Sequence, residues 1–304
     1  MQPGESEPTK YELPFRHSTI QTTISQKTLN LLFPQWQGSG ITNELYHGAM
    51  SIYDYLKEMT QFDRVPVPPN QTLKLEKGIL GYSLILQQLS QAKQIIQQHD
   101  PNRLFVIGGD CSIDIAPISF LNQKYNSDLA VVWLDAHADL NTPASSPSKH
   151  FHGMPLRVLL GEGDSEIVNT LFSVLSPSQV FLVGARDFDP PEINYLRQRN
   201  IALFAPKKIK HNCQDLIKAI SDSNFRNIHI HFDLDAIDPL EFPSVKCPAA
   251  NGLTIELLSE LLQQLSNRFN LVGFSITEFA SLKEQGLDKI TDIISNIFNR
   301  IQHR

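Results

Sequence analysis

Short apolar runs alternate along the chain with longer stretches in which apolar residues recur at helical spacing. The short runs are rich in β-branched residues and several are apolar throughout, which is typical of strands buried on both faces of a parallel sheet. We expect strands at residues 29–33, 103–107, 129–134, 180–184, 201–204, 227–232 and 271–276.

Three longer stretches repeat apolar residues every three or four positions, as amphipathic helices do. They cover residues 77–99, 254–267 and 287–302, and Thr254 can cap the second helix. Because strands and helices alternate throughout and no linker interrupts them, we predict one mostly parallel α/β domain over residues 1–304. Residues 1–25 are expected to form a poorly ordered or loosely packed extension.

Composition and charge exclude several classes of protein. The chain has 304 residues, 41% of them hydrophobic, so a sizeable core can form. A net charge of −6 argues against a nucleic-acid-binding protein, which would carry a basic excess. No apolar run approaches the roughly 18 residues that a membrane span needs, and the polar N-terminus does not resemble a signal peptide. Three cysteines without a CxxC pair favour a reducing compartment, hence the cytoplasm.

Polar residues follow four of the predicted strands. In open α/β sheets the carboxyl ends of parallel strands meet at one edge, where ligands bind. We therefore expect a cluster of carboxylates and one histidine at this edge. The segments are Gly-Gly-Asp-Cys-Ser (108–112), Asp135-Ala-His137-Ala-Asp139, Asp233-Leu-Asp235-Ala-Ile-Asp238 and Thr277-Glu278.

Such a cluster requires a counter-charge, since aspartates gathered without a cation repel one another. Carboxylates are hard oxygen ligands and His137 adds an imidazole, a mixture that suits Mn²⁺. Alternation along an extended segment directs positions 135, 137 and 139 to one face. Two metals about 3.5–4 Å apart could then activate a water. The candidate oxygen ligands are Asp135, Asp139, Asp233 and Asp235.

The motifs, taken in this order, resemble those of the arginase family of ureohydrolases. GGDCS at 108–112 is similar to the family's GGDHS, and DAHADLNTP, HGMPL and FDLDAIDP match its signatures. The similarity extends over roughly residues 100–280. It implies a three-layer α/β/α fold, two divalent metal ions, a small guanidino substrate and assembly into a homotrimer or homohexamer. It also implies cleavage of a guanidinium group to urea and an amine by a metal-bridging hydroxide.

The resemblance also implies roles for individual residues. Asp135 and Asp233 would bridge two manganese ions, with Asp139 on the first metal and His137 and Asp235 on the second. Asp139 would also orient the hydroxide, His152 would pass a proton to the leaving amine, and Glu278 would bind the guanidinium group. Asn141 and Ser148 would contact a substrate α-carboxylate, and Asp189 and Glu192 an α-amino group. The alternative is that these last four are only polar loop residues.

The sequence departs from the family at the first metal ligand, where Cys111 replaces a histidine. A thiolate is softer than Mn²⁺ prefers and adds a negative charge. Cys111 could therefore be a thiolate ligand, a thiol beside a weak or empty first site, or a buried residue without a ligand role. Cys247 replaces a threonine near the pocket, and two cysteines facing one cavity would allow zinc binding or redox sensitivity. Lys149 is expected to point to solvent, with a direct charge contact to a substrate carboxylate as the alternative.

His229 and His231 face one side of a predicted strand beneath the site. We expect them to form hydrogen bonds there, with direct ligation as the alternative. The leading hypothesis for the whole chain is a metal-dependent hydrolase of arginine or a close guanidino acid. A hydrolase of agmatine or another guanidino or amidino compound is the first alternative. A metal-poor, non-catalytic ligand-binding relative is the second.

Overall fold

The computed structural model describes residues 1, 27–40, 42–280 and 286–303. Residues 2–25 of the expected N-terminal extension lie outside this part. Eight strands of the described residues form one parallel sheet in the order β2-β1-β5-β10-β9-β6-β7-β8. The strands are β1 (Thr28–Phe33), β2 (Asp63–Arg64), β5 (Arg103–Gly108), β6 (Leu129–Leu134), β7 (Val180–Val183), β8 (Ala202–Phe204), β9 (Asn227–Asp233) and β10 (Asn270–Thr277).

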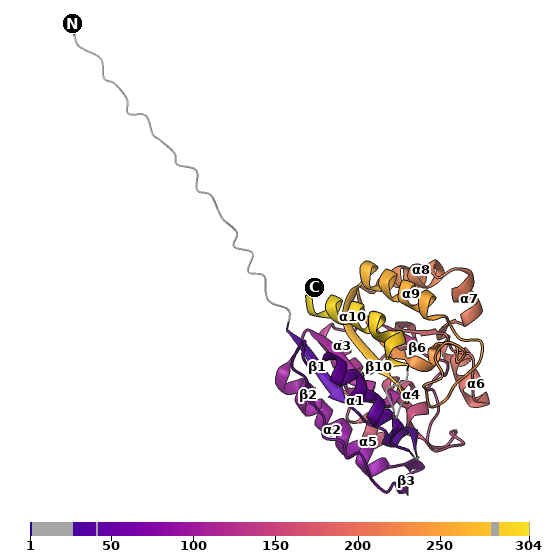
Figure 1. Ribbon diagram of the computed structural model, residues 1–304. Coiled ribbons are helices and arrows are strands. Elements are labelled where there is room, and N and C mark those ends of the chain that lie inside the picture. Colours follow the sequence, from indigo (N-terminus) through magenta and orange to yellow (C-terminus); the bar gives the residue numbers. More distant parts are fainter. Residues whose placement is uncertain (2–26, 41, 281–285, 304) are drawn as a thin grey trace.

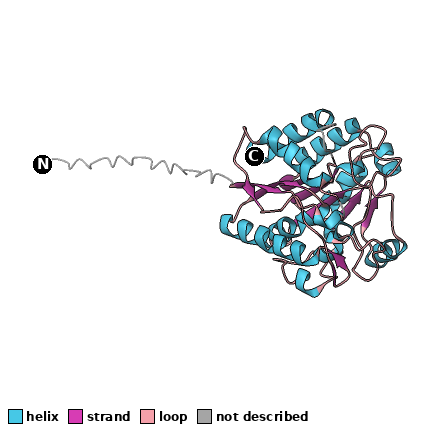
Figure 2. Ribbon diagram, turned by 60° about the horizontal axis from the view of Figure 1, so that its bottom comes forward, coloured by secondary structure: helices cyan, strands magenta, loops and turns pink. Residues whose placement is uncertain are grey.

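Helices cover both faces of this sheet (Figure 2), so the predicted three-layer α/β/α architecture is confirmed. One face is packed by α2 (Tyr82–His99), α3 (Ile115–Lys124), α4 (Pro155–Leu159), α5 (Ser165–Val168) and α6 (Pro190–Arg199). The other is packed by α1 (Glu44–Leu56), α7 (Pro206–His211), α8 (Gln214–Asp222), α9 (Ile255–Arg268) and α10 (Leu287–His303). None of the helices in the described ranges is long and apolar enough to cross a membrane.

All seven predicted strands are present, and the helices predicted at 254–267 and 287–302 correspond to α9 and α10 (Figure 1). Thr254 caps α9, because its hydroxyl oxygen accepts a hydrogen bond from the amide of Leu257 at 3.2 Å. The helix predicted at 77–99 begins later, at Tyr82. Residues 75–80 form instead a small antiparallel pair, β3 (Leu75–Glu76) with β4 (Ile79–Leu80), and Gly81 adopts φ 78°, which ends the strand before the helix.

The strand register aligns the carboxyl ends of the central strands. Leu134 of β6 pairs with Phe232 of β9, and Thr277 of β10 pairs with Asp233. The chain leaves β5 through α3 and enters β6, while β10 and β9 lie between these two strands. The segments after β5, β6, β9 and β10 therefore converge at a point where the strand order reverses, which is where open α/β sheets bind ligands.

Helix α1 packs closely against the segment that follows β10. A Cβ added at Gly48 would lie 1.6 Å from the carbonyl oxygen of Phe279. Phe279 comes directly after Glu278, so the glycine sets the position of the loop that carries this candidate catalytic residue. A larger side chain at position 48 would push the helix or the loop away.

Replacing Gly48 with alanine tests this contact. Helix propensity alone predicts a gain of about 1 kcal/mol in stability, whereas overpacking predicts a loss of about 1–3 kcal/mol. We expect a loss, measured as a lower midpoint of thermal unfolding. Gly153→Ala is the control, since a Cβ there meets no atom within 4 Å. A stabilised Gly48→Ala protein would contradict the close approach of α1.

Candidate metal centre and active-site cavity

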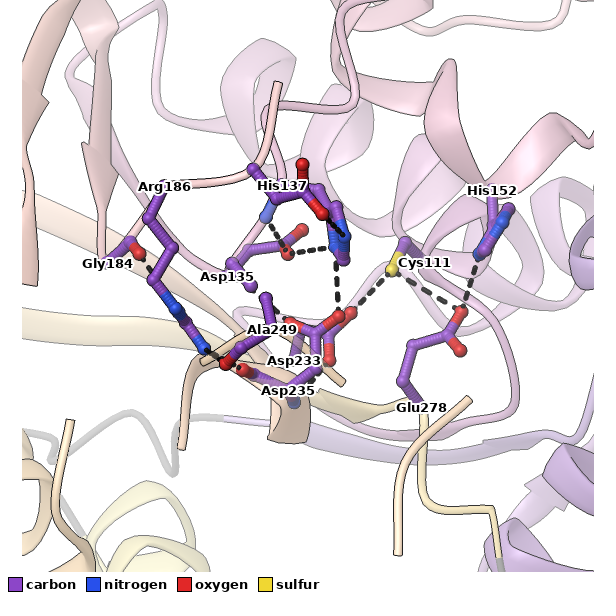
Figure 3. Close-up of polar contacts among 12 residues, drawn as sticks. Cys111, Asp135, His137, His152, Gly184, Arg186, Asp233, Asp235, Ala249 and Glu278 are labelled. Atoms are coloured by element: carbon purple, nitrogen blue, oxygen red, sulfur yellow. Dashed lines mark hydrogen bonds and ion pairs between the residues drawn. The ribbon is translucent and has the colours of Figure 1, made fainter. Parts of the chain in front are cut away.

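The loops at the carboxyl ends of the sheet enclose a cavity of about 170 Å³. Asp135 and Glu278 contact His137 and His152, which line this cavity (Figure 3). The structure thus brings together the residues that the sequence singled out from segments far apart in the chain. Of the predicted residues, Cys111, His137, Asp139, Asn141, Ser148, His152, Asp189, Glu192, Asp233 and Asp235 line the cavity.

Three groups of side chains within the described residues place potential ligand atoms within 4.8 Å of one another. Asp135 and Cys111 each belong to two of them. One group joins Asp135 with His137 and Asp235, and another joins Cys111, Asp233 and Glu278. The remaining group is Cys111, Asp135, Asp139 and His231.

Two carboxylates hold the ring of His137. Its Nδ1 lies 2.9 Å from Oδ2 of Asp235 and 3.5 Å from Oδ1 of Asp135. Burial disfavours a charged ring, but the hydrogen bonds and charges of these two aspartates raise the pKa of His137 well above its ordinary value. A positive charge is therefore favoured between these two acids.

Three acids of the cluster resist ionisation without a cation. Burial first, and the neighbouring carboxylates second, raise the pKa of Asp135, Asp139 and Asp233. Burial together with the surrounding carboxylates also raises the pKa of the Cys111 thiol. Oδ2 of Asp139 is buried and has no hydrogen-bond partner in the described part of the chain. This arrangement fits divalent cations, which would neutralise the acids and satisfy that oxygen.

Local hydrogen bonds fix the orientation of the acids. Trp133 donates its indole N–H to Oδ2 of Asp135 at 3.0 Å, and the amide of Asp235 donates to Oδ1 of Asp233 at 2.7 Å. Asp139 and Glu278 have φ angles of 54° and 64°, in the left-handed region that few non-glycine residues adopt. Such backbone conformations are concentrated at functional sites, where the surrounding structure imposes them.

Cys111 is held at the first turn after β5. A Cβ at Gly109 would lie 1.8 Å from the carbonyl oxygen of Gln35, so only glycine fits there. Asp110 caps the short helix η2 (Cys111–Asp114) by accepting the amide of Ser112 at 3.0 Å. The thiol of Cys111 then donates to Oδ2 of Asp233 at 3.0 Å. Cys111 thus lies among the candidate ligands, and its ligation remains a prediction.

His152 and Glu278 form a buried pair beside the acid cluster. Nδ1 of His152 lies 3.1 Å from Oε1 of Glu278, and the amide of Glu278 donates to the carbonyl of Gly109 at 2.7 Å. Burial lowers the pKa of His152, but the charge and hydrogen bond of Glu278 outweigh it, so the net shift is upward. Oε2 of Glu278 is buried without a hydrogen-bond partner among the described residues and is free to accept from a ligand.

Arg186 positions the cluster from behind, a role that the sequence did not indicate. Its guanidinium donates to four backbone carbonyls, those of Gly184, Asp235, Ala249 and Ala250, at 2.6–3.1 Å (Figure 3). These bonds tie the loop after β9 to the loop after β7. In the sequence Arg186 is an arginine next to Asp187, and that position does not predict contacts with backbone carbonyls 49 to 64 residues away.

The rim of the cavity is polar. The amide of Asn141 donates to Oδ2 of Asp189 at 2.8 Å, and Ser148 lines the same side. Glu192 also lines the cavity, but its two oxygens accept the backbone amides of Leu140 and Asp189, both at 2.9 Å. In this structure Glu192 therefore holds Asp189 in place, and direct contact with substrate stays a prediction for both acids.

The expectations for the other singled-out residues have mixed outcomes. Cys247 lines the cavity together with Cys111, as expected, and burial raises the pKa of its thiol to about 12. Lys149 is only half-buried but donates to the carbonyl of Pro143 at 2.8 Å instead of standing free in solvent. His229 and His231 form the expected hydrogen bonds beneath the site. Both contact Asp114, a residue that the sequence analysis did not consider.

A sequence model described as the arginase family matches residues 41–297. The chain belongs to the arginase family. The arginase of Staphylococcus aureus strain MRSA252 is 33% identical over 210 residues, which cover 67% of this chain and 69% of that relative. This chain is accordingly an arginase-family hydrolase.

Solved structures confirm the arginase-like fold. The crystal structure of Entamoeba histolytica arginase in complex with L-ornithine has a TM-score of 0.80 at 24% identity, covering 90% of this chain and 98% of that one. The formimidoylglutamase of Bacillus subtilis strain 168 has a TM-score of 0.71 at 16% identity, covering 91% and 87%. The same fold is therefore found in hydrolases with different names.

Glu192 generates a pH prediction for the metal-free protein. Burial raises the pKa of its carboxyl group from 4.5 to about 7. Because the folded pKa exceeds the unfolded one, this group stabilises the fold most below about pH 4.5 and progressively less as the pH rises towards 7. We expect Glu192→Gln, which cannot ionise, to lose less stability than the parent protein between pH 5 and pH 8. Thermal unfolding across this range measures the difference, and a steeper loss in the variant would contradict the raised pKa.

Proposed function

We propose that this arginase-family hydrolase cleaves the guanidinium group of arginine or a close guanidino acid to urea and an amine, using two divalent metal ions, Mn²⁺ foremost. One observation carries the proposal. Most of the candidate metal ligands and His152, which contacts Glu278, line a single cavity, and that cavity has a polar rim suited to an amino acid.

The candidate ligands of the two metals are Cys111, Asp135, Asp139, Asp233, His137 and Asp235. By the family resemblance Asp135 and Asp233 would be shared by the two metals, and both lie in the ligand groups of this cluster. A bound pair of divalent cations supplies Lewis-acid chemistry and lowers the pKa of water near neutral pH. Asp139 would hold the first metal and would also accept a hydrogen bond from that water.

Glu278 would bind the guanidinium group. It is 2% exposed and its Oε2 lacks a hydrogen-bond partner among the described residues. A guanidinium ion presents several N–H donors, and a carboxylate binds such a cation by charge-assisted hydrogen bonds. The acidic surroundings favour a cationic substrate for the same electrostatic reason.

His152 would supply a proton to the leaving amine. The upward shift of its pKa favours the protonated ring. A protonated histidine can act as a general acid towards a leaving amine. Its hydrogen bond to Glu278 places it next to the residue that would hold the substrate.

Asn141, Ser148 and Asp189 would recognise the amino acid end of the substrate. The Asn141 amide has a second N–H beyond the one bonded to Asp189, and Ser148 has a hydroxyl, so both could donate to a carboxylate. Asp189 would accept from an α-amino group. The Entamoeba relative, which binds the amino acid L-ornithine, supports a substrate of this class.

Hydrolysis of agmatine or of another guanidino or amidino compound is the second candidate. The formimidoylglutamase structure favours it, because a protein with the same fold carries the name of an enzyme with a substrate other than arginine. A non-catalytic role receives less support, since Asp139 and His152 line the cavity and Glu278 contacts His152.

A cytoplasmic location and assembly into a homotrimer or homohexamer are also part of the proposal. The location is supported by the three cysteines, all described and none in a disulfide, which suits a reducing compartment. The assembly rests on family resemblance alone, and sedimentation of the purified chain would measure it.

Replacing Asp233 with asparagine tests the metal-dependent mechanism. We expect urea release from arginine to fall below about 1% and bound Mn²⁺ to decrease, because even residues behind the ligands contribute about 10–100-fold to metal affinity. Urea formation and metal content are measured on the same sample. Asp238→Asn is the control: this aspartate lies in the same motif but accepts the amide of Leu240. Full activity of Asp233→Asn would contradict the mechanism.

Replacing Ser148 with alanine tests the choice of substrate. A hydrogen bond to a charged group contributes about 1.5–3 kcal/mol, so kcat/KM for arginine should fall roughly 10–100-fold. Agmatine lacks the carboxylate, and its hydrolysis should be unaffected, which makes it an internal control. Equal losses for both substrates would mean that Ser148 does not read the carboxylate.

A further inference from the structure

His231 lies among the candidate ligands of the first metal. One of its ring nitrogens is within 4.8 Å of ligand atoms of Cys111, Asp135 and Asp139. The side chain is fully buried, and Nε2 has no hydrogen-bond partner among the described residues. A buried ring nitrogen facing two carboxylates and a thiol is costly to leave unpaired, and a metal ion would pair it.

The other ring nitrogen of His231 is already bonded. Nδ1 lies 2.7 Å from Oδ2 of Asp114, which is fully buried and also accepts the hydroxyl of Ser275. A carboxylate in this position accepts a hydrogen bond from the Nδ1–H, and in that tautomer the Nε2 lone pair is free. Metal-binding histidines usually donate their second ring N–H to a carboxylate or a carbonyl in this way.

Packing fixes the orientation of the His231 ring. His231 pairs in strand register with Trp133 of β6. Its ring stacks on the indole of Trp133, with ring centroids 3.7 Å apart and an interplanar angle of 14°. The same indole donates to Asp135. The short helix η2 carries Cys111 at one end and Asp114 at the other, so a single element bears both a candidate ligand and the residue that orients His231.

We propose that His231 is a ligand of the first metal ion, through Nε2, together with Cys111, Asp135 and Asp139. This inference rests on the proposed function, because it assigns a residue to the first of the two proposed metals. It gives each metal one imidazole, since His137 serves the second. A neutral nitrogen ligand completes the first site without adding another negative charge to a cluster already rich in carboxylates.

His229 provides a matched control. It lies on the same strand, faces the same side and contacts the same Asp114 at 3.3 Å. It belongs to none of the ligand groups in the described residues, and it packs against Gly273, where an added Cβ would lie 2.0 Å from its Nδ1. A purely structural role of the buried histidines would affect both residues alike.

Metal titration of His231→Gln and His229→Gln separates ligation from support. We expect one of the two Mn²⁺ sites of His231→Gln to weaken by more than about 100-fold, while His229→Gln changes by less than about tenfold. Calorimetry gives the affinities, and the metal content after dialysis confirms the stoichiometry. Equal losses in the two variants, or two sites of unchanged affinity in His231→Gln, would overturn the inference.

A measurement on the unmutated chain guards against a variant that fails to fold. The full-length protein, with ¹⁵N-labelled histidine rings, is titrated with diamagnetic Zn²⁺ and followed by NMR. We expect Nε2 of His231 and one ring nitrogen of His137 to shift, with His229 unchanged. Bound Zn²⁺ that shifts His137 but leaves His231 unchanged overturns this inference alone. If Zn²⁺ changes the ring-nitrogen signals of neither His137 nor His231, the two-metal function is contradicted as well.

Discussion

Repulsion among buried carboxylates at the ends of the strands is the constraint on which the site depends. Asp135, Asp139, Asp233 and Asp235 are each at most 4% exposed, with Glu278 beside them. A protein could relieve such repulsion by protonating the acids, and burial does raise the pKa of three of them. The candidate nitrogen and sulfur ligands among the acids fit the solution that the proposed function invokes, which is divalent cations.

The rest of the fold maintains this unfavourable arrangement. Parallel register brings the ends of β5, β6, β9 and β10 to one place, and Arg186 fixes the loops behind Asp235 through backbone carbonyls. Asp114 supports the site from below, because its carboxylate lies within hydrogen-bond distance of His229 and His231 on β9. Because these supports are packed into the core, they hold the acids close together, as the proposed metal site requires.

Much of this could be predicted from sequence, for identifiable reasons. Apolar runs of β-branched residues located the buried strands, and polar residues directly after them located the site, because register in a parallel sheet aligns strand ends. The sequence prediction began α2 at residue 77, too early. The β3–β4 pair and the left-handed Gly81 occupy the residues before Tyr82, where the helix begins. The roles of Arg186 and Asp114 depend on contacts between distant segments, and no spacing along the chain encodes them. Nor did any motif indicate that His231 stacks on Trp133.

The most direct test of this account is the position of Mn²⁺ in crystals of the protein grown with saturating Mn²⁺, measured by anomalous diffraction. The account predicts two anomalous peaks per chain at the carboxyl ends of the strands. One would lie between Asp135, His137 and Asp235, and the other between Cys111, Asp135 and Asp139. The absence of Mn²⁺ from both groups would contradict the claim that cations offset the buried acids.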